Sequence, residues 1–188
     1  MEPSLSKMVA DSCQALQSVL TQEAMFEKIA AALVATLKHG GKVLACGNGG
    51  SAAAAMHLAE ELIGRYRHNR RALPGLALNA DATALTCIAN DFGYDDVFAR
   101  QVEGLGQPGD MLICFTTSGN SPNILRAIAA AKKIGMKSVA LLGKTGGAAK
   151  GQADFEIIVA GADTARIQEA HTLLLHALLE RVECEFPI

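Results

Sequence analysis

Residues 42–56 have the sequence KVLACGNGGSAAAAM, in which a short apolar run passes through small residues into an alanine-rich segment. Apolar runs of roughly four to eight residues that end at glycine are typical of buried strands. Alanine is the residue that favours helix most strongly. The stretch therefore predicts a strand over 42–46, a loop GNGGS over 47–51 and a helix that ends near Ile63.

The same succession of strand, polar loop and helix is predicted further along the chain. MLICFTT at 111–117 leads into the loop SGNS at 118–121, which opens a helix ending at Gly135. Three other apolar runs predict strands: GLALN at 75–79, KSVALLG at 137–143 and FEIIV at 155–159. Helical spacing predicts two helices between Ser4 and Leu37 that break near Thr21, a helical stretch from Thr83 to Leu105 interrupted around Gly93, and a final helix from Thr164 to Glu185.

Five apolar strands that alternate with helices predict a parallel sheet covered on both faces, hence a three-layer αβα fold. With right-handed crossovers, the order expected for such a chain is 2-1-3-4-5, as in flavodoxin-like folds. The topological switch point then falls between the first and third strands, so GNGGS and SGNS meet in one crevice. We expect a single domain over 1–188, with an N-terminal helical extension over 1–40 and an α/β core over 41–188.

Composition excludes several classes of function. Half of the 188 residues are hydrophobic, which supports a sizeable core. The formal net charge of −2 and the lack of Trp argue against nucleic acid as a partner. We find no signal peptide and no apolar run that would span a membrane, and the five widely spaced cysteines predict reduced thiols in the cytoplasm. Cys46 and Cys114 lie in apolar runs and are interpreted as core residues.

The two polar loops have the composition of a phosphate cradle. Small residues let backbone N–H groups approach an anion, and each loop enters a helix whose N-terminus carries partial positive charge. The alternative is that Gly, Ser and Asn serve only as turn and capping residues. The occurrence of two such loops at one switch point favours the phosphate cradle over this alternative. Neither loop has the spacing of a dinucleotide or Walker motif, so nucleotides are disfavoured.

His57 and Glu61 stand four residues apart on the helix that follows the first loop, so they share one face. That spacing suits a shared metal ion or substrate, whereas the alternative is a polar pair at the surface. The surrounding alanines favour the first interpretation because they predict a closely packed helix. Glu60 is interpreted as surface charge.

The last helix carries polar residues in an apolar run: Gln168, Glu169, His171 and His176. A histidine among leucines is most often a hydrogen-bonded core residue, which stays an alternative for both histidines. Gln168 and His176 are separated by about 80° around the helix and ~12 Å along it. If both serve one site, a bend or a neighbouring subunit must contribute, which hints at an oligomer.

Four blocks of the chain together resemble the sugar isomerase (SIS) domain, and more narrowly the sedoheptulose 7-phosphate (phosphoheptose) isomerase family. The blocks are GKVLACGNGGSAAAAMHLAEEL, IANDFGYDDVFARQV, TTSGNSPNILRAI and ARIQEAHTLLLH. The resemblance implies conversion of sedoheptulose 7-phosphate to D-glycero-D-manno-heptose 7-phosphate, the first step towards the ADP-heptose of lipopolysaccharide core. It also implies a cytoplasmic homotetramer with active sites between subunits and one Zn²⁺ per subunit.

The resemblance also implies roles for individual residues. The substrate contacts of the family fall on Asn48, Gly49, Gly50, Ser51, Glu61, Asn90, Asp91, Thr116, Thr117, Ser118, Ser121 and Gln168. Its metal ligands fall on His57, Glu61, Gln168 and His176, and its catalytic pair on Glu61 and His176. Asn90 and Asp91 come from the resemblance alone.

Our hypothesis for the chemistry is an isomerisation through an enediol(ate), with Glu61 as the base and His176 moving protons among the sugar oxygens. Two alternatives stay open at this point. One is a non-catalytic SIS-domain protein that binds the replication initiator, a group that has lost acid/base positions matching Glu61 and His176. The other is an isomerase of a different phosphosugar, because the loops indicate phosphate more firmly than sugar length. The role of Arg65 is open between a phosphate contact and a solvated surface residue.

Overall fold

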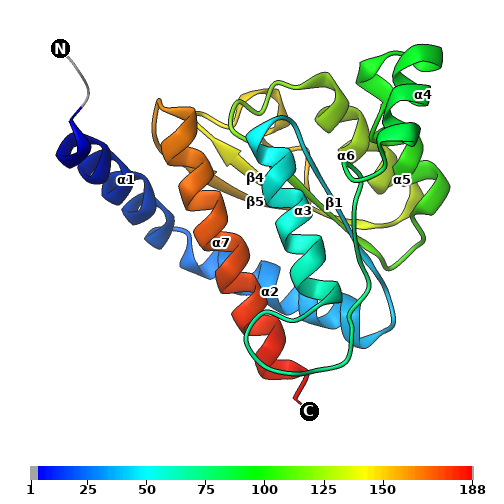
Figure 1. The fold of residues 1–188 in the computed structure, drawn as a ribbon, viewed down its shortest axis with the longest axis horizontal. Helices are drawn as coiled ribbons and strands as arrows, with labels where there is room; N and C mark the ends of the chain where they lie inside the picture. The colour runs from blue at the N-terminus through cyan, green and yellow to red at the C-terminus, as the bar shows by residue number, and fades with distance from the viewer. Residues whose placement is uncertain (1–3, 188) are drawn as a thin grey trace.

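The computed structural model describes residues 4–187, which form a five-stranded sheet with helices on both sides (Figure 1). The strands are β1 (Val43–Gly47), β2 (Gly75–Ala77), β3 (Met111–Thr116), β4 (Lys137–Gly143) and β5 (Phe155–Val159). The α-helices are α1 (Leu5–Leu20), α2 (Glu23–Lys38), α3 (Gly50–Ile63), α4 (Ala82–Phe92), α5 (Ala99–Leu105), α6 (Pro122–Ile134) and α7 (Thr164–Glu185). Two short 3₁₀ helices, η1 (Tyr94–Asp96) and η2 (Gly147–Ala149), complete the described elements.

The sheet has the predicted order β2-β1-β3-β4-β5, and all four strand pairs are parallel. Val43 of β1 stands opposite Gly75 on one side and Met111 on the other, so the three strands start level. The predicted strands at 137–143 and 155–159 and the helix at 164–185 are confirmed at both ends. The predicted αβα class and its switch point between β1 and β3 are therefore confirmed.

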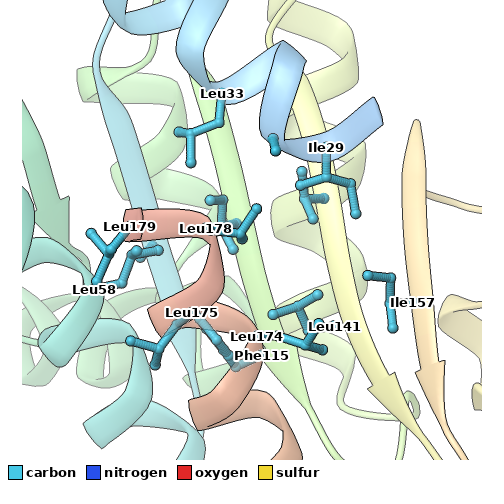
Figure 2. Packing of buried hydrophobic residues seen from close by; sticks show 14 of the residues in the cluster. Ile29, Leu33, Leu58, Phe115, Leu141, Ile157, Leu174, Leu175, Leu178 and Leu179 are labelled. Carbon is cyan, nitrogen blue, oxygen red and sulfur yellow. The ribbon is translucent and has the colours of Figure 1, made fainter. Parts of the chain in front are cut away.

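One face of the sheet is covered by α2, α3 and α7, and the other by α5 and α6 (Figure 1). Figure 2 shows the first layer, where Ile29 and Leu33 of α2 and Leu58 of α3 approach the strands beside the leucines of α7. Because α2 contributes fully buried side chains, the helical extension is continuous with the hydrophobic core. This layer places α3 and α7 next to one another above the ends of β1 and β3.

Glycine ends two of the helices where the sequence predicts a stop. Gly135 adopts a left-handed conformation directly after α6, with φ at +88°, and Gly40 lies just past α2 with φ at +82°. Such angles cost glycine little, because it has no Cβ. Cys46 and Cys114 are fully buried on adjacent strands with their sulfur atoms 3.6 Å apart, as expected for core thiols. The hydrogen bond between the two thiols and, next to it, burial raise the pKa of Cys46.

Two helices expose apolar side chains. None of the residues of α4 is buried. Phe92, a large apolar residue at its end, is about half exposed. In α1, Leu5, Val9 and Leu20 are all more than half exposed, while Ala15 and Val19 face the core. Within residues 4–187, no helix combines the length and apolar character needed to cross a membrane.

Candidate active site

The two polar loops meet at the switch point and are joined by a reciprocal pair of side-chain amides. Asn48 in the β1–α3 loop donates from Nδ2 to Oδ1 of Asn123 at 2.8 Å, and Asn123 in α6 donates back to Oδ1 of Asn48 at 2.9 Å. The Tyr94 hydroxyl of η1 adds a third bond, donating to Oδ1 of Asn48 at 3.1 Å. The predicted meeting of the loops is confirmed, and the amides of the half-buried Asn48 and the buried Asn123 connect them.

In the first loop, glycine allows α7 to approach the start of α3. A Cβ at Gly50 would lie 2.5 Å from Nε2 of Gln168, so a larger residue there would displace that side-chain amide. Gly49 has φ at +57° and is exposed, and Ser51 is buried in the first turn of α3. Gln168 therefore stands against the N-terminus of α3, where an anion would be favoured.

The second loop is braced by the glycine-rich turn between β4 and β5. Oγ1 of Thr116 accepts from the backbone of Gly119 at 3.1 Å, and Oγ of Ser118 accepts from the backbone of Asn120 at 3.2 Å. Gly119 has φ at +65°, and a Cβ there would collide with the carbonyl of Gly146. The loop is thereby fixed in shape by its own hydroxyls and by close backbone contact.

The N-terminus of α6 presents an unused hydroxyl to this loop. Ser121 occupies the position before the helix, yet in the part of the chain described here its side chain makes no capping hydrogen bond. Pro122 follows at the first helical position, where its fixed φ suits the helix and no N–H is lost from the ladder. The Ser121 hydroxyl is therefore available to a ligand at the N-terminus of α6.

Three of the predicted acid/base and metal residues gather between α3 and α7. Nε2 of His57 lies 3.3 Å from Oε1 of Glu61, and the rings of His57 and His176 meet edge to face with centroids 5.0 Å apart. Glu61 is only 16% exposed and His57 is 35% exposed, so the pair is not the solvated surface pair of the alternative interpretation. The structure brings His57, Glu61 and His176 together, and their roles stay predictions.

We call the cluster of His57, Glu61 and His176 between α3 and α7 the seam. Its side chains are donors that suit a divalent metal ion of the zinc type. Two imidazoles and a carboxylate are donors that Zn²⁺ accepts, whereas the side-chain amide of Gln168 lies two turns away against Gly50. Ligand atoms of His57, Glu60 and Glu61 also lie within 4.8 Å of one another. Glu60 is 67% exposed and 3.9 Å from His57, so it stands at the solvent edge of the seam.

Gln168 is separated from His176 along α7, as the helical geometry predicts. α7 is a continuous helix of 22 residues, with Gln168 beside Gly50 and His176 two turns further on beside His57. A pocket of about 350 Å³ lies between α3 and α7 at the level of Gln168, and His57 is part of its wall. His57 thus borders both the pocket and the ring of His176.

His171 is a core residue and not a site acid or base. It is 1% exposed, and its Nε2 lies 3.1 Å from the carbonyl oxygen of Leu142 in β4. Burial lowers its pKa from 6.5 to about 4, against the smaller opposing effect of that hydrogen bond, so the ring is neutral at pH 7. The alternative of a hydrogen-bonded core histidine is therefore confirmed for His171.

Other sequence candidates lie apart from the seam. Asn90 and Asp91 are exposed at the end of α4, where Asn90 donates to Asp91 at 2.7 Å; among residues 4–187 no hydrogen bond joins either to the two loops. Arg65 is exposed and donates to Asn69 at 2.9 Å, which matches the surface interpretation.

Two residues of the site were not singled out from the sequence. Asn123 lies one residue inside α6, and nothing in the sequence distinguishes a buried asparagine there from an ordinary first-turn residue. Tyr66 stacks on His176 with ring centroids 5.4 Å apart and an interplanar angle of 26°. It lies in a loop without periodicity, so its contact with α7 has no local sequence signature.

The fold and the site together define a class of proteins, the SIS domains, and the family profile described as "SIS domain" matches residues 9–143. The chain belongs to this family. Within it, the chain belongs with the phosphoheptose isomerases, since proteins of that name share about half of its residues. The phosphoheptose isomerase of Campylobacter concisus is 53% identical over 151 residues, 80% of each chain. That of Vibrio cholerae is 49% identical over 181 residues, 94% of each chain.

A solved structure agrees with this assignment. The phosphoheptose isomerase of Neisseria gonorrhoeae superposes with a TM-score of 0.87 at 40% identity, covering 95% of this chain and 96% of its own. The agreement extends over both N-terminal helices and α7, so the elements that form the seam belong to the shared fold.

Proposed function

We propose that this protein is an aldose–ketose isomerase that converts sedoheptulose 7-phosphate to D-glycero-D-manno-heptose 7-phosphate. The observation that carries the proposal is the cluster of His57, Glu61 and His176, which lies on the helix leaving one polar loop and on its neighbour. The phosphoheptose isomerases of similar sequence support this choice of substrate over other phosphosugars. The presence of both Glu61 and His176 favours an enzyme over a non-catalytic binding protein.

The two loops would bind the phosphosugar through neutral donors. Backbone N–H groups at the N-termini of α3 and α6 favour a phosphate, and the uncommitted hydroxyl of Ser121 adds a donor. We assign substrate contacts to Asn48, Gly49, Gly50, Ser51, Glu61, Asn90, Asp91, Thr116, Thr117, Ser118, Ser121 and Gln168. Because the amide pair of Asn48 and Asn123 fixes the two loops relative to one another, the cradle is formed before substrate arrives.

Glu61 is the base in the proposed mechanism. Its carboxylate removes the C1 proton of the ketose, and the electron pair moves to form the enediolate between C1 and C2. The proton is then returned to C2, which leaves the carbonyl at C1. Partial burial, at 16% exposure, favours the reaction because it limits competing solvation of the carboxylate.

His176 moves the second proton. The hydroxyl on C1 must lose its proton and the oxygen on C2 must gain one, and a single imidazole beside both can do this. The edge-to-face contact with His57 and the stacked ring of Tyr66 set the orientation of the imidazole. Opening of the cyclic sugar is a second step that the same residue would serve.

We assign the metal ligands to His57, Glu61, Gln168 and His176, for one Zn²⁺ per subunit. Because Gln168 lies two turns from His176 on one continuous helix, a neighbouring subunit would have to complete the set. The ion would supply an electrophile for the sugar oxygens and fix the ligands in place. Because Glu61 cannot be a firm ligand and a free base at once, we expect its coordination to be loose.

We further propose a cytoplasmic homotetramer with active sites between subunits. The support is the apolar surface of α1 and α4, since α4 buries no residue in the single chain and ends at Asn90 and Asp91. Light scattering on the purified protein should give four times the 19.6 kDa mass of the chain. A monomer at assay concentration would refute the shared sites.

The test of the activity is proton NMR of purified protein with sedoheptulose 7-phosphate, as isolated, after chelation and after addition of Zn²⁺. We expect new aldose anomeric signals, their loss after chelation and their return with zinc. The coupling of these signals identifies the anomer formed. No conversion under any metal condition would refute the activity, and conversion that survives chelation would refute the metal requirement.

A further inference from the structure

The loop between α3 and β2, residues 64–74, curves around the C-terminal end of α7 (Figure 1). It is fastened there by a carboxylate of that helix. Oε1 of Glu183 accepts backbone N–H groups from Tyr66 at 3.1 Å, Arg67 at 2.9 Å and His68 at 3.3 Å. Burial alone would raise the pKa of Glu183, but these backbone donors outweigh it and hold the pKa below its ordinary value.

A second contact fastens the same loop to α3. The guanidinium of Arg70 donates to the carbonyl oxygens of Glu61 at 2.5 Å and Leu62 at 2.9 Å, which are among the last acceptors of that helix. A cation is favoured at a helix C-terminus, where carbonyls lack partners within the helix. The loop is thus tied to both helices that form the seam.

At the first of these contacts, the loop places the ring of Tyr66 against His176. The rings are stacked with centroids 5.4 Å apart, and His176 meets His57 on another side. In the described part of the chain, the imidazole of His176 has these ring contacts but no hydrogen-bond partner. Its orientation therefore depends on packing, and Tyr66 supplies one of the two packed aromatic surfaces.

Glu183 lies on the same helix as His176, so it can fix the loop that carries Tyr66 relative to that histidine. It lies seven residues after His176, two helical turns along the same side of α7. One helix therefore carries both the imidazole and the carboxylate that fixes the ring stacked upon it. Any displacement of the loop relative to α7 would move Tyr66 relative to His176.

We propose that Glu183 and Tyr66 are positioning residues for His176, with Glu183 acting through the backbone of the loop and Tyr66 through its ring. The proposal rests on the isomerase function for its kinetic consequence. Misplacement of a catalytic group by about 1 Å costs up to ~100-fold in rate, so the effect belongs in kcat. Substrate affinity, which depends on the loops after β1 and β3, should change little.

The test combines kinetics with a readout that needs no activity. Tyr66→Leu, Tyr66→Phe, Glu183→Ala and the double variant Tyr66→Leu/Glu183→Ala are compared with Glu180→Ala. Glu180 is a matched control, because it contacts the same loop through an exposed ion pair with Arg67 at 2.7 Å. The ring-proton resonances of His176 are followed with ¹³C-labelled histidine, since stacking on Tyr66 displaces them and the chain has only five histidines.

We expect kcat to fall about tenfold in Tyr66→Leu and in Glu183→Ala, with KM within about twofold. Tyr66→Phe keeps the ring and should keep wild-type kcat, as should Glu180→Ala. The double variant should lose no more than either single one, because both substitutions break one chain of contacts. The His176 resonances should shift in the same direction in Tyr66→Leu and Glu183→Ala. They should keep their wild-type positions in Tyr66→Phe and Glu180→Ala.

Additive losses in the double variant, or an unmoved His176 resonance in Glu183→Ala, would overturn the role of Glu183. A kcat of Tyr66→Leu equal to wild type would overturn the role of Tyr66. If the wild-type protein lacks isomerase activity, the resonance shifts still test the contacts, so this failure is distinct from failure of the proposed function. Urea unfolding of each variant at the assay temperature shows that the rate was measured on folded protein.

Discussion

Helix α7 presents two histidines, five residues apart, to two different surroundings. His171 faces the sheet, where it is 1% exposed beneath β4 and contacts Phe115 and the carbonyl of Leu142. His176 faces α3 and is half-buried against His57 and Tyr66. The same side chain type is therefore a neutral core residue on one side of the helix and part of the acid/base cluster on the other.

The difference shows that surroundings, and not residue type, assign the chemistry. In the core, burial lowers the pKa of His171 to about 4, so the ring cannot exchange protons with substrate near pH 7. In the seam, a carboxylate, a second imidazole and the mouth of a pocket lie close together.

The largest loss of kcat is expected when Glu61 of α3 is replaced. Glu61→Gln removes the base but keeps the size of the side chain, so kcat should fall by about 10²–10⁴-fold. The free energy of unfolding should change by less than about 1 kcal/mol, because Glu61 lies outside the hydrophobic clusters. Steady-state kinetics and urea unfolding measure the two quantities. Turnover within about twofold of wild type would show that another group is the base.

Substitution of His171, on the side of α7 that faces the sheet, should lower stability rather than turnover. His171→Ala leaves a cavity in the core and removes one hydrogen bond to the Leu142 carbonyl, which should destabilise the fold by about 2–4 kcal/mol at pH 8. His176→Ala, the matched control, should cost less than about 1 kcal/mol because that ring is half-buried and makes no hydrogen bond in the described chain. Urea unfolding of both variants measures the contrast, and equal losses would abolish it.

The pH dependence of stability should also belong to His171. The unfolded imidazole has a pKa near 6.5 and the folded one near 4, so acid protonates the unfolded chain first and favours unfolding. The contribution is complete above pH 6.5, decreases as pH falls through this interval and amounts to about 3 kcal/mol. Urea unfolding between pH 8 and pH 4 should show this decrease in wild type and lose it in His171→Ala. An unchanged slope in the variant would assign the decrease to other groups.

Residues on the solvent-exposed side of α7 should contribute least to the free energy of unfolding and to kcat. Arg181 pairs with Glu27 at 2.6 Å, but both side chains are about half exposed. Arg181→Met should change the free energy of unfolding by less than about 0.5 kcal/mol and leave kcat unchanged. A loss above about 1 kcal/mol in urea unfolding would mean that this pair is coupled to the core.

The fold was predictable because its determinants are local. Each strand is a short apolar run that ends at a polar or glycine-rich loop, and the order of strands follows from right-handed crossovers. The bounds of β4, β5 and α7 were therefore obtained from residues 137–185 directly. The short β2 was less sharply bounded, since pairing with β1 alone decides where it ends.

The site was predictable where spacing on one helix determines proximity, as for His57 and Glu61. The contacts of Asn123 and Tyr66 depend on tertiary packing between segments distant in sequence, for which no periodicity exists. Composition and helical spacing did not distinguish the two histidines of α7, and only the family resemblance singled out His176. Asn90 and Asp91 stay predictions from family resemblance.

The amide pair of Asn48 and Asn123 has a consequence for how this sequence can change. Each side chain uses both its oxygen and its nitrogen on the other. Replacing Asn48 therefore leaves both polar atoms of the buried Asn123 amide without these partners, whereas replacing Asn123 leaves the nitrogen of Asn48 without its acceptor while Tyr94 still donates to its oxygen. Positions 48 and 123 should therefore vary together in any selected library, although 75 residues separate them. Mutational paths that alter one loop alone would pass through a weakened intermediate.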